Sequence, residues 1–223
     1  MICSSRLRCD SFGGLGLPDA CFKSLGELMA DFDIAYGETE LREGGYVNDP
    51  VDRGGETHRG VSRKFNPDWD GWALVDRLKR ENPRDFKAVI NENVELSSLA
   101  KELFRVRYWM PIRGDEIPDQ HIANKVFDTG VNQGVGRSVR YLQVGLNRLN
   151  RNEKDYADIQ VDGKFGDRTL ATLGAFLELE KGRPDYLLKI LNLMQAAHYL
   201  DVMNRDSTQE RFARGWLNRV DLC

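Results

Sequence analysis

Apolar residues recur at helical spacing along most of this 223-residue chain, and the pattern predicts a mainly α-helical protein. The first stripe begins at Phe22 and continues towards Leu41, where the pair Gly44-Gly45 ends the predicted helix. This helix delivers Glu43 at or just past its C-terminal end, on a rigid support. No strand-like alternation of useful length occurs, so any sheet should be small.

Two more helices are predicted in the first half of the chain. Asn66-Pro67 has the form of an N-cap followed by a proline at the first helical position, and Asn82-Pro83 ends that helix. Its apolar stripe contains Trp69 and Trp72, which are typical of a core, with a cleft wall for sugar stacking as the alternative. A clean helical stripe then runs over residues 96–104.

A second helical set follows the polar segment at residues 113–118, which is the first candidate for a domain boundary. The pattern predicts a helix over residues 121–128 that stops at Gly130. Apolar residues at spacings of four and three predict the next helix over residues 135–149. After a polar loop and a turn, Asp167 is a predicted N-cap, and a last long helix completes the set.

Composition and charge narrow the class of protein. A hydrophobic content of 41% and a charged content of 30% are those of an ordinary soluble globular chain. A net charge of −3 gives no basic surface for nucleic acid or anionic membrane. The chain contains no run of about eighteen apolar residues, so the sequence predicts no membrane span. The N-terminus lacks the apolar core of a signal peptide. The four cysteines and three histidines lack metal-ligand spacing, so we expect no metal and no cofactor.

Residues 43–61 combine acids, two glycine pairs, a proline and a tyrosine without helical or strand periodicity. Glycine pairs allow backbone angles that other residues avoid, so a tight fold can bring distant side chains together. Four acids could then face one cleft: Glu43, Asp49, Asp52 and Glu56. Judged as an anonymous stretch, a polar surface loop is the alternative.

The motif Glu-Gly-Gly-Tyr-x-Asn-Asp-Pro-x-Asp-x-Gly-Gly-x-Thr-x-x-Gly-Val in this stretch resembles the signature of glycoside hydrolase family 108, which contains bacterial and phage N-acetylmuramidases. The resemblance implies a lysozyme-like fold for residues 22–112 and cleavage of the β-1,4 bond between N-acetylmuramic acid and N-acetylglucosamine. It also implies that Glu43 is the catalytic acid.

Glycoside hydrolysis needs a second group that holds a water or stabilises the oxocarbenium ion. Asp52 and Asp49 are the candidates, with Asp52 ahead because the glycines that follow can fold it back. Asp49 can equally be a turn residue beside Pro50.

Other motif residues are candidates for substrate binding. Tyr46 and Asn48 could contact sugar, and burial of Tyr46 under the loop is an equal alternative. The Thr57 hydroxyl could form a hydrogen bond within the cleft, although threonine side chains in loops more commonly form hydrogen bonds with the nearby backbone. We expect His58 to be exposed beside the cleft.

Two C-terminal features resemble peptidoglycan-binding modules. Residues 124–149 resemble the predicted peptidoglycan-binding region that accompanies family 108, and the turn at residues 161–169 is similar to a motif of helical peptidoglycan-binding modules. The similarity implies substrate contacts for Asp162 and Lys164. We therefore expect three parts: a disordered leader at 1–21, the muramidase domain at 22–112 and a helical peptidoglycan-binding domain at 119–218. Whether the two helical parts fold separately stays open.

These observations favour a muramidase that acts on peptidoglycan glycan strands as a monomer, without nucleic acid and without stable membrane insertion. It would be made in the bacterial cytoplasm, lack a recognisable signal peptide, and act at the periplasm or cell wall, in lysis or in wall remodelling for export. The alternative is a non-catalytic peptidoglycan-binding accessory protein of a secretion or phage system.

Overall fold

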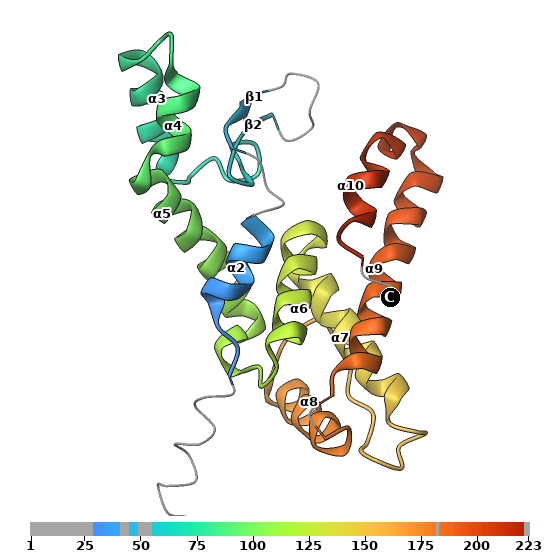
Figure 1. The fold of residues 1–223 in the computed structure, drawn as a ribbon. Coiled ribbons are helices and arrows are strands. Elements are labelled where there is room, and N and C mark those ends of the chain that lie inside the picture. Colours follow the sequence, from blue (N-terminus) through green and yellow to red (C-terminus); the bar gives the residue numbers. More distant parts are fainter. Residues whose placement is uncertain (1–28, 41–44, 49–54, 182, 221–223) are drawn as a thin grey trace, which may run out of the picture.

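The computed structural model describes residues 29–40, 45–48, 55–181 and 183–220, and this part of the chain is mainly α-helical (Figure 1). The mainly α, lysozyme-like fold that the sequence predicts is confirmed. No helix in these ranges is long and apolar enough to cross a membrane. The α-helices are α2 (Phe32–Glu40), α3 (Gly71–Glu81), α4 (Phe86–Glu92), α5 (Val94–Phe104), α6 (Gln120–Gln133), α7 (Val135–Leu149), α8 (Asp167–Leu179), α9 (Asp185–Arg205) and α10 (Ala213–Leu217).

One small antiparallel sheet lies between α2 and α3 in the sequence, as the lack of alternation predicts. Its strands are β1 (Val47–Asn48), β2 (Glu56–His58) and β3 (Val61–Ser62), in the order β1-β2-β3. Val47 pairs with Thr57, and Thr57 pairs with Ser62. The residues that connect β2 to β3, Arg59 and Gly60, both have positive φ, which closes a tight turn.

Helix α2 begins at Phe32, so the prediction of a helix that already covers Met29 is wrong. The side chain of Asp31 accepts hydrogen bonds from the N–H groups of Asp33 (2.6 Å) and Ile34 (3.2 Å), which caps the helix at this point. The helix ends at Glu40, close to the predicted end at Leu41. The beginning of the predicted helix, residues 22–28, lies outside the described residues.

Helix α3 begins at Gly71, four residues later than the Asn66-Pro67 pair predicts. Asn66 does not cap a helix because its polar groups have other partners. Its Oδ1, the atom that would cap a helix, accepts a hydrogen bond from Arg107 (2.5 Å), and its side-chain amide donates to the carbonyl of Ser62 (3.1 Å). The predicted end of this helix at Asn82 is confirmed.

The two tryptophans of this region belong to the core, and the cleft-wall alternative is wrong. Trp69 is 7% exposed and Trp72 is 4% exposed, and their rings meet edge to face at 5.0 Å. Gly71 permits this packing, because a Cβ at that position would come within 2.3 Å of the Trp69 ring.

Helix α5 continues into short π and 3-10 turns that extend into the polar connector. These are η1 (Arg105–Trp109), η2 (Met110–Ile112) and η3 (Gly114–Glu116). The buried Trp109 indole donates to the carboxylate of Asp115 (2.8 Å), and its ring packs against Gly114. A further 3-10 segment, η4 (Ser207–Phe212), joins α9 to α10.

Two boundaries in the second half differ from the predictions. Helix α6 does not stop at Gly130 but passes through it. That glycine is buried and lets α7 approach, since a Cβ there would lie 3.3 Å from Ser138 Oγ. The helix ends instead at Gly134, whose φ is +93°. Helix α7 has the predicted bounds. Asp167 is the first residue of α8 and not its N-cap, since its carboxylate pairs with Arg113 (2.5 Å).

The core continues across the polar connector. Helix α6 contacts α2 on one side and α7 and α9 on the other (Figure 1). The ring of Phe32 lies 5.6 Å from that of Trp109 and 5.9 Å from that of Phe127. The division into 22–112 and 119–218 stays a prediction, and the leader at 1–21 lies outside the described residues.

Candidate functional site

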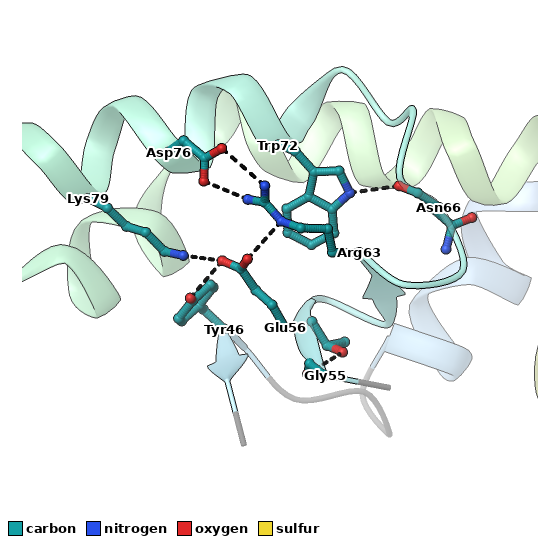
Figure 2. A network of polar contacts seen from close by, with 9 residues as sticks. Tyr46, Gly55, Glu56, Arg63, Asn66, Trp72, Asp76 and Lys79 are labelled. Atoms are coloured by element: carbon teal, nitrogen blue, oxygen red, sulfur yellow. Dashed lines mark hydrogen bonds and ion pairs between the residues drawn. The ribbon is translucent and has the colours of Figure 1, made fainter. Parts of the chain in front are cut away.

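The described part of the acidic motif is organised by Glu56, which sits in a network of four other side chains (Figure 2). Its Oε1 accepts a hydrogen bond from the Tyr46 hydroxyl (2.7 Å) and pairs with the Lys79 ammonium. Its Oε2 pairs with Arg63 Nε at 2.7 Å. The same guanidinium donates two hydrogen bonds to Asp76, at 2.6 and 3.0 Å. Glu56 thereby fastens β2 to the end of β3 and to α3.

Charges of opposite sign alternate through this network. Hydrogen bonds from Arg63 lower the pKa of the Asp76 carboxyl, and the same contact raises the pKa of Arg63. Burial alone lowers the pKa of Lys79, but hydrogen bonds with Glu56 and Tyr46 outweigh it and raise the pKa overall. Burial raises the pKa of Tyr46. Both oxygens of Glu56 are engaged, Oε1 by two hydrogen-bond donors and Oε2 by the ion pair with Arg63, so this acid has a structural role.

Helix α4 holds the chain next to the segment at residues 41–44. The N–H of Tyr46 donates to Asn91 Oδ1 (2.7 Å), and Arg59 donates to the Asn91 carbonyl (3.1 Å). A side chain at Gly45 would come within 2.6 Å of Asn91 Oδ1, so glycine is required for this approach. Tyr46 is 5% exposed, which fits the burial alternative; its contact with sugar stays a prediction.

The predicted catalytic acids, Glu43, Asp49 and Asp52, lie outside the described residues. The structure describes what flanks them. Glu43 follows α2, which ends at Glu40, and Asp49 and Asp52 fall between β1 and β2 in the sequence. Their catalytic roles stay predictions.

Two predicted substrate-binding residues lie on the sheet. Asn48 is exposed on β1 and pairs with Glu56 in the strand register. The Thr57 hydroxyl donates a hydrogen bond to the Gly55 carbonyl (3.3 Å). It therefore satisfies a backbone group of the loop, which is the alternative to substrate contact. Direct contact of Asn48 or Thr57 with substrate stays a prediction.

The prediction that His58 is exposed is wrong. His58 is 0% exposed, and its ring stacks on that of Trp69 at 6.2 Å. Neither ring nitrogen has a hydrogen-bond partner among the described residues, and burial lowers its pKa to about 4. His58 lies on β2, the central strand of the sheet, and the loop-like sequence does not reveal this strand position.

The turn that resembles a peptidoglycan-binding motif is held by Gln143 of α7. Its amide donates to Asp162 Oδ1 (2.9 Å) and its oxygen accepts from the Gly163 N–H (2.9 Å). Asp162 also accepts from the Lys164 N–H (2.8 Å), and these hydrogen bonds lower the pKa of its carboxyl. Gly163 has a φ of +78° and lies against the Gly136 carbonyl, so a side chain does not fit. Asp162 shapes the turn, Lys164 is exposed, and binding by either stays a prediction.

A second buried polar network joins α6, α9 and the C-terminal tail. Asp128 pairs with Arg219 at 2.7 Å, with side chains 6% and 10% exposed. The fully buried Gln195 donates to Asp128 (3.4 Å) and to the Tyr199 hydroxyl (3.2 Å), which donates to Asn132 (2.7 Å). Asp128 and Asn132 belong to the region that resembles a peptidoglycan-binding sequence, and this network gives both a structural role.

Sequence reasoning missed the partners of Glu56. Lys79 and Asp76 lie three residues apart on α3, so their shared face is the one signal that the sequence contains. Nothing in the sequence indicates Arg63 or Asn91, because their contacts depend on how the sheet meets α3 and α4.

Comparisons with known proteins agree with this architecture. Residues 37–134 match the family model described as Glycosyl hydrolase 108, and residues 137–221 match the one described as Predicted Peptidoglycan domain. A search of curated proteins gives no significant match. Among solved structures, SagA of Brucella abortus is similar, with 25% sequence identity over 85% of this chain and 88% of that chain, and a TM-score of 0.55.

The two family matches lie side by side in the predicted order, and together they account for most of the described residues. Residues 124–134, which the sequence assigned to the peptidoglycan-binding region, belong to the hydrolase match. Residues 37–134 thus form a glycosyl hydrolase 108 region that is followed by a peptidoglycan-binding region, and the chain is a glycosidase that acts on peptidoglycan.

Proposed function

We propose that this chain cleaves the β-1,4 bond between N-acetylmuramic acid and N-acetylglucosamine, with Glu43 as the general acid. The observation that carries the proposal is the match of residues 37–134 to glycosyl hydrolase 108, because the resemblance makes Glu43 the acid. The state of Glu56, whose two oxygens are occupied by Tyr46, Lys79 and Arg63, agrees with it. Of the four acids in the motif, this one serves the scaffold. Glu43, Asp49 and Asp52 are the acids left for chemistry.

Glu43 donates its proton to the glycosidic oxygen while the bond to the anomeric carbon breaks and the sugar gains oxocarbenium character. An acid that starts protonated is needed for this step. Glu43 comes three residues after the end of α2. The carbonyl groups at the end of a helix bear partial negative charge, which favours the protonated form of a carboxyl close to them.

Asp52 is the proposed second carboxylate, which stabilises the cation or orients water, and Asp49 is the competing candidate. Asp52→Asn should then lower the rate strongly, and Asp49→Asn should act mainly on stability, through the turn beside Pro50. The opposite ranking would exchange the two roles. Tyr46, Asn48 and Thr57 support the loop and the glycan beside it.

The C-terminal region, proposed as a domain at 119–218 beside a hydrolase domain at 22–112, binds the wall. Lys164 offers an exposed ammonium to anionic groups there, and Asp162 holds the turn in shape. We propose that the protein is made in the bacterial cytoplasm and acts as a monomer at the wall, in lysis or in remodelling for export.

Mass spectrometry of digested peptidoglycan tests the reaction. Reducing-end muramic acid supports it, whereas reducing-end glucosamine or cut peptides would overturn it. Glu43→Gln keeps the shape but cannot donate a proton, so lytic activity should fall at least about a hundredfold with little change in thermal stability. Glu102→Gln, an exposed position on α5, is the matched control. A Glu43→Gln protein that clears peptidoglycan at the wild-type rate excludes Glu43 as the acid.

A further inference from the structure

A polar pocket of about 310 Å³ lies along α6 between α2 and α9. Its floor is closed by the buried pair of Asp128 with Arg219 and by Lys125, whose ammonium reaches Gln195 and the Arg219 carbonyl. Among the residues that the structure describes, neither the hydrolase motif nor the turn at residues 161–169 contributes a lining residue to this pocket.

The rim of the pocket carries charges of both signs. Glu38, Asp185 and Lys189 line it together with His121, and all four are exposed. Within the described ranges, none of these side chains has a hydrogen-bond or ion-pair partner, in contrast to the occupied oxygens of Glu56. Unpartnered charges of both signs around a hollow fit a ligand that itself carries both signs.

The lining also argues against a simple sugar platform. It contains no tryptophan, tyrosine or phenylalanine among the described residues, whereas pyranose rings are commonly stacked on such side chains. The pocket follows α6 from His121 to Asp128, which at 1.5 Å per residue is about 10 Å. That length accommodates about three residues of an extended peptide.

The pocket is close to the proposed catalytic acid along the chain. Thr39, in the last turn of α2, lines it and lies four residues before Glu43. The chain that connects the two positions is therefore at most about 14 Å long. In peptidoglycan, a peptide stem with free carboxylates branches from the muramic acid itself, next to the bond that the proposed reaction cleaves.

We propose that this pocket binds the peptide stem of peptidoglycan, with Lys189 facing stem carboxylates and with Glu38 and Asp185 facing a stem amine. The inference rests on the proposed function for its biological setting. It makes the enzyme sensitive to whether the glycan strand is substituted, which a site that contacts only sugar would not be.

Two measurements test the pocket. The first compares hydrolysis of intact peptidoglycan with hydrolysis of the same material after an amidase has removed the stems. For Lys189→Glu, the ratio of the first rate to the second should fall about tenfold relative to wild type, the scale of one charge-assisted contact. Lys181→Glu, an exposed lysine outside the pocket, is the control and should leave both rates unchanged.

The second measurement titrates a synthetic stem tetrapeptide into full-length protein carrying Glu43→Gln, so that binding is read without hydrolysis. Saturable binding that Lys189→Glu weakens about tenfold supports the pocket. No binding, or binding that Lys189→Glu and Lys181→Glu affect equally, overturns it. If wild-type protein releases no reducing-end muramic acid while the tetrapeptide still binds at the pocket, the proposed reaction fails and the peptide site stands.

Discussion

The buried histidine of β2 makes a testable prediction about acid stability. The pKa of His58 is lowered by burial to about 4, whereas an unfolded chain keeps the ordinary value of 6.5. Between those two values the unfolded state binds more protons than the folded state, so the free energy of unfolding falls as pH falls. The difference of about 2.5 between the two pKa values corresponds to a loss of about 3 kcal/mol in the free energy of unfolding. This loss is complete near pH 4.

The surroundings of the His58 ring explain why its pKa is low. The His58 ring is 0% exposed, stacks on Trp69, and has Arg59 as its neighbour of like charge. Neither nitrogen has a partner within the described residues, so protonation would create a buried charge with nothing to balance it. His58→Phe keeps a ring against Trp69 and removes the proton site. Its stability at pH 7 should therefore not fall by more than about 1 kcal/mol.

The assay is urea unfolding of both proteins from pH 7.5 to pH 4.5. Carboxylates titrate in the lower part of this range, but they do so in both proteins, so the difference between the two curves isolates His58. Wild type should lose about 2 to 3 kcal/mol more than His58→Phe over the range. Parallel curves would show that the ring is hydrated or paired in solution, and the argument from burial would be refuted.

Three further predictions concern the scaffold and the second half. Glu56→Gln should lower stability by about 2 to 3 kcal/mol, because it leaves the partly buried Lys79 without its carboxylate and removes one of the two carboxylates at Arg63, whereas Glu116→Gln should cost at most about 1 kcal/mol at its exposed pair; equal losses in thermal melts would contradict this. The fragment 22–113 should be insoluble or unfolded, and a folded fragment that cleaves short glycans would establish two independent domains. Lys164→Ala combined with Arg168→Ala should weaken sedimentation with insoluble peptidoglycan while turnover of short glycans survives; unchanged sedimentation would remove wall binding from this turn.

The sequence predicts an element best where local signals and tertiary packing agree. Helix α7 has the predicted bounds. Gly134 and Asn150 flank its apolar stripe in the sequence, and in the structure they are the N-cap and the C-cap of the helix. Helix α3 starts later than predicted because Asn66, a strong local capping signal, uses its side-chain hydrogen bonds on Ser62 and Arg107 instead. A local pattern cannot show such competition.

The site divides in the same way. The motif names the acids, and its glycines indicate a tight backbone, which Gly45 against Asn91 illustrates. The sequence does not show that Glu56 is occupied, because its partners Lys79 and Arg63 come together with it only when the sheet packs on α3. The loop-like pattern around His58 likewise hides a buried strand position.

The relation between the two halves follows from where α6 packs. The polar connector looks like a domain boundary in the sequence, yet the match to the hydrolase family continues through α6 to residue 134. Phe127 of α6 lies against Phe32 of α2, and Gln120 of α6 donates to the Asp31 carbonyl just before α2 (2.9 Å). A hydrolase half cut at residue 112 would therefore lose one wall of its own core. Helix α9 in turn fastens the C-terminal tail to the far side of α6 through the network around Gln195. The second half therefore completes the core of the hydrolase half, and the two halves share helix α6.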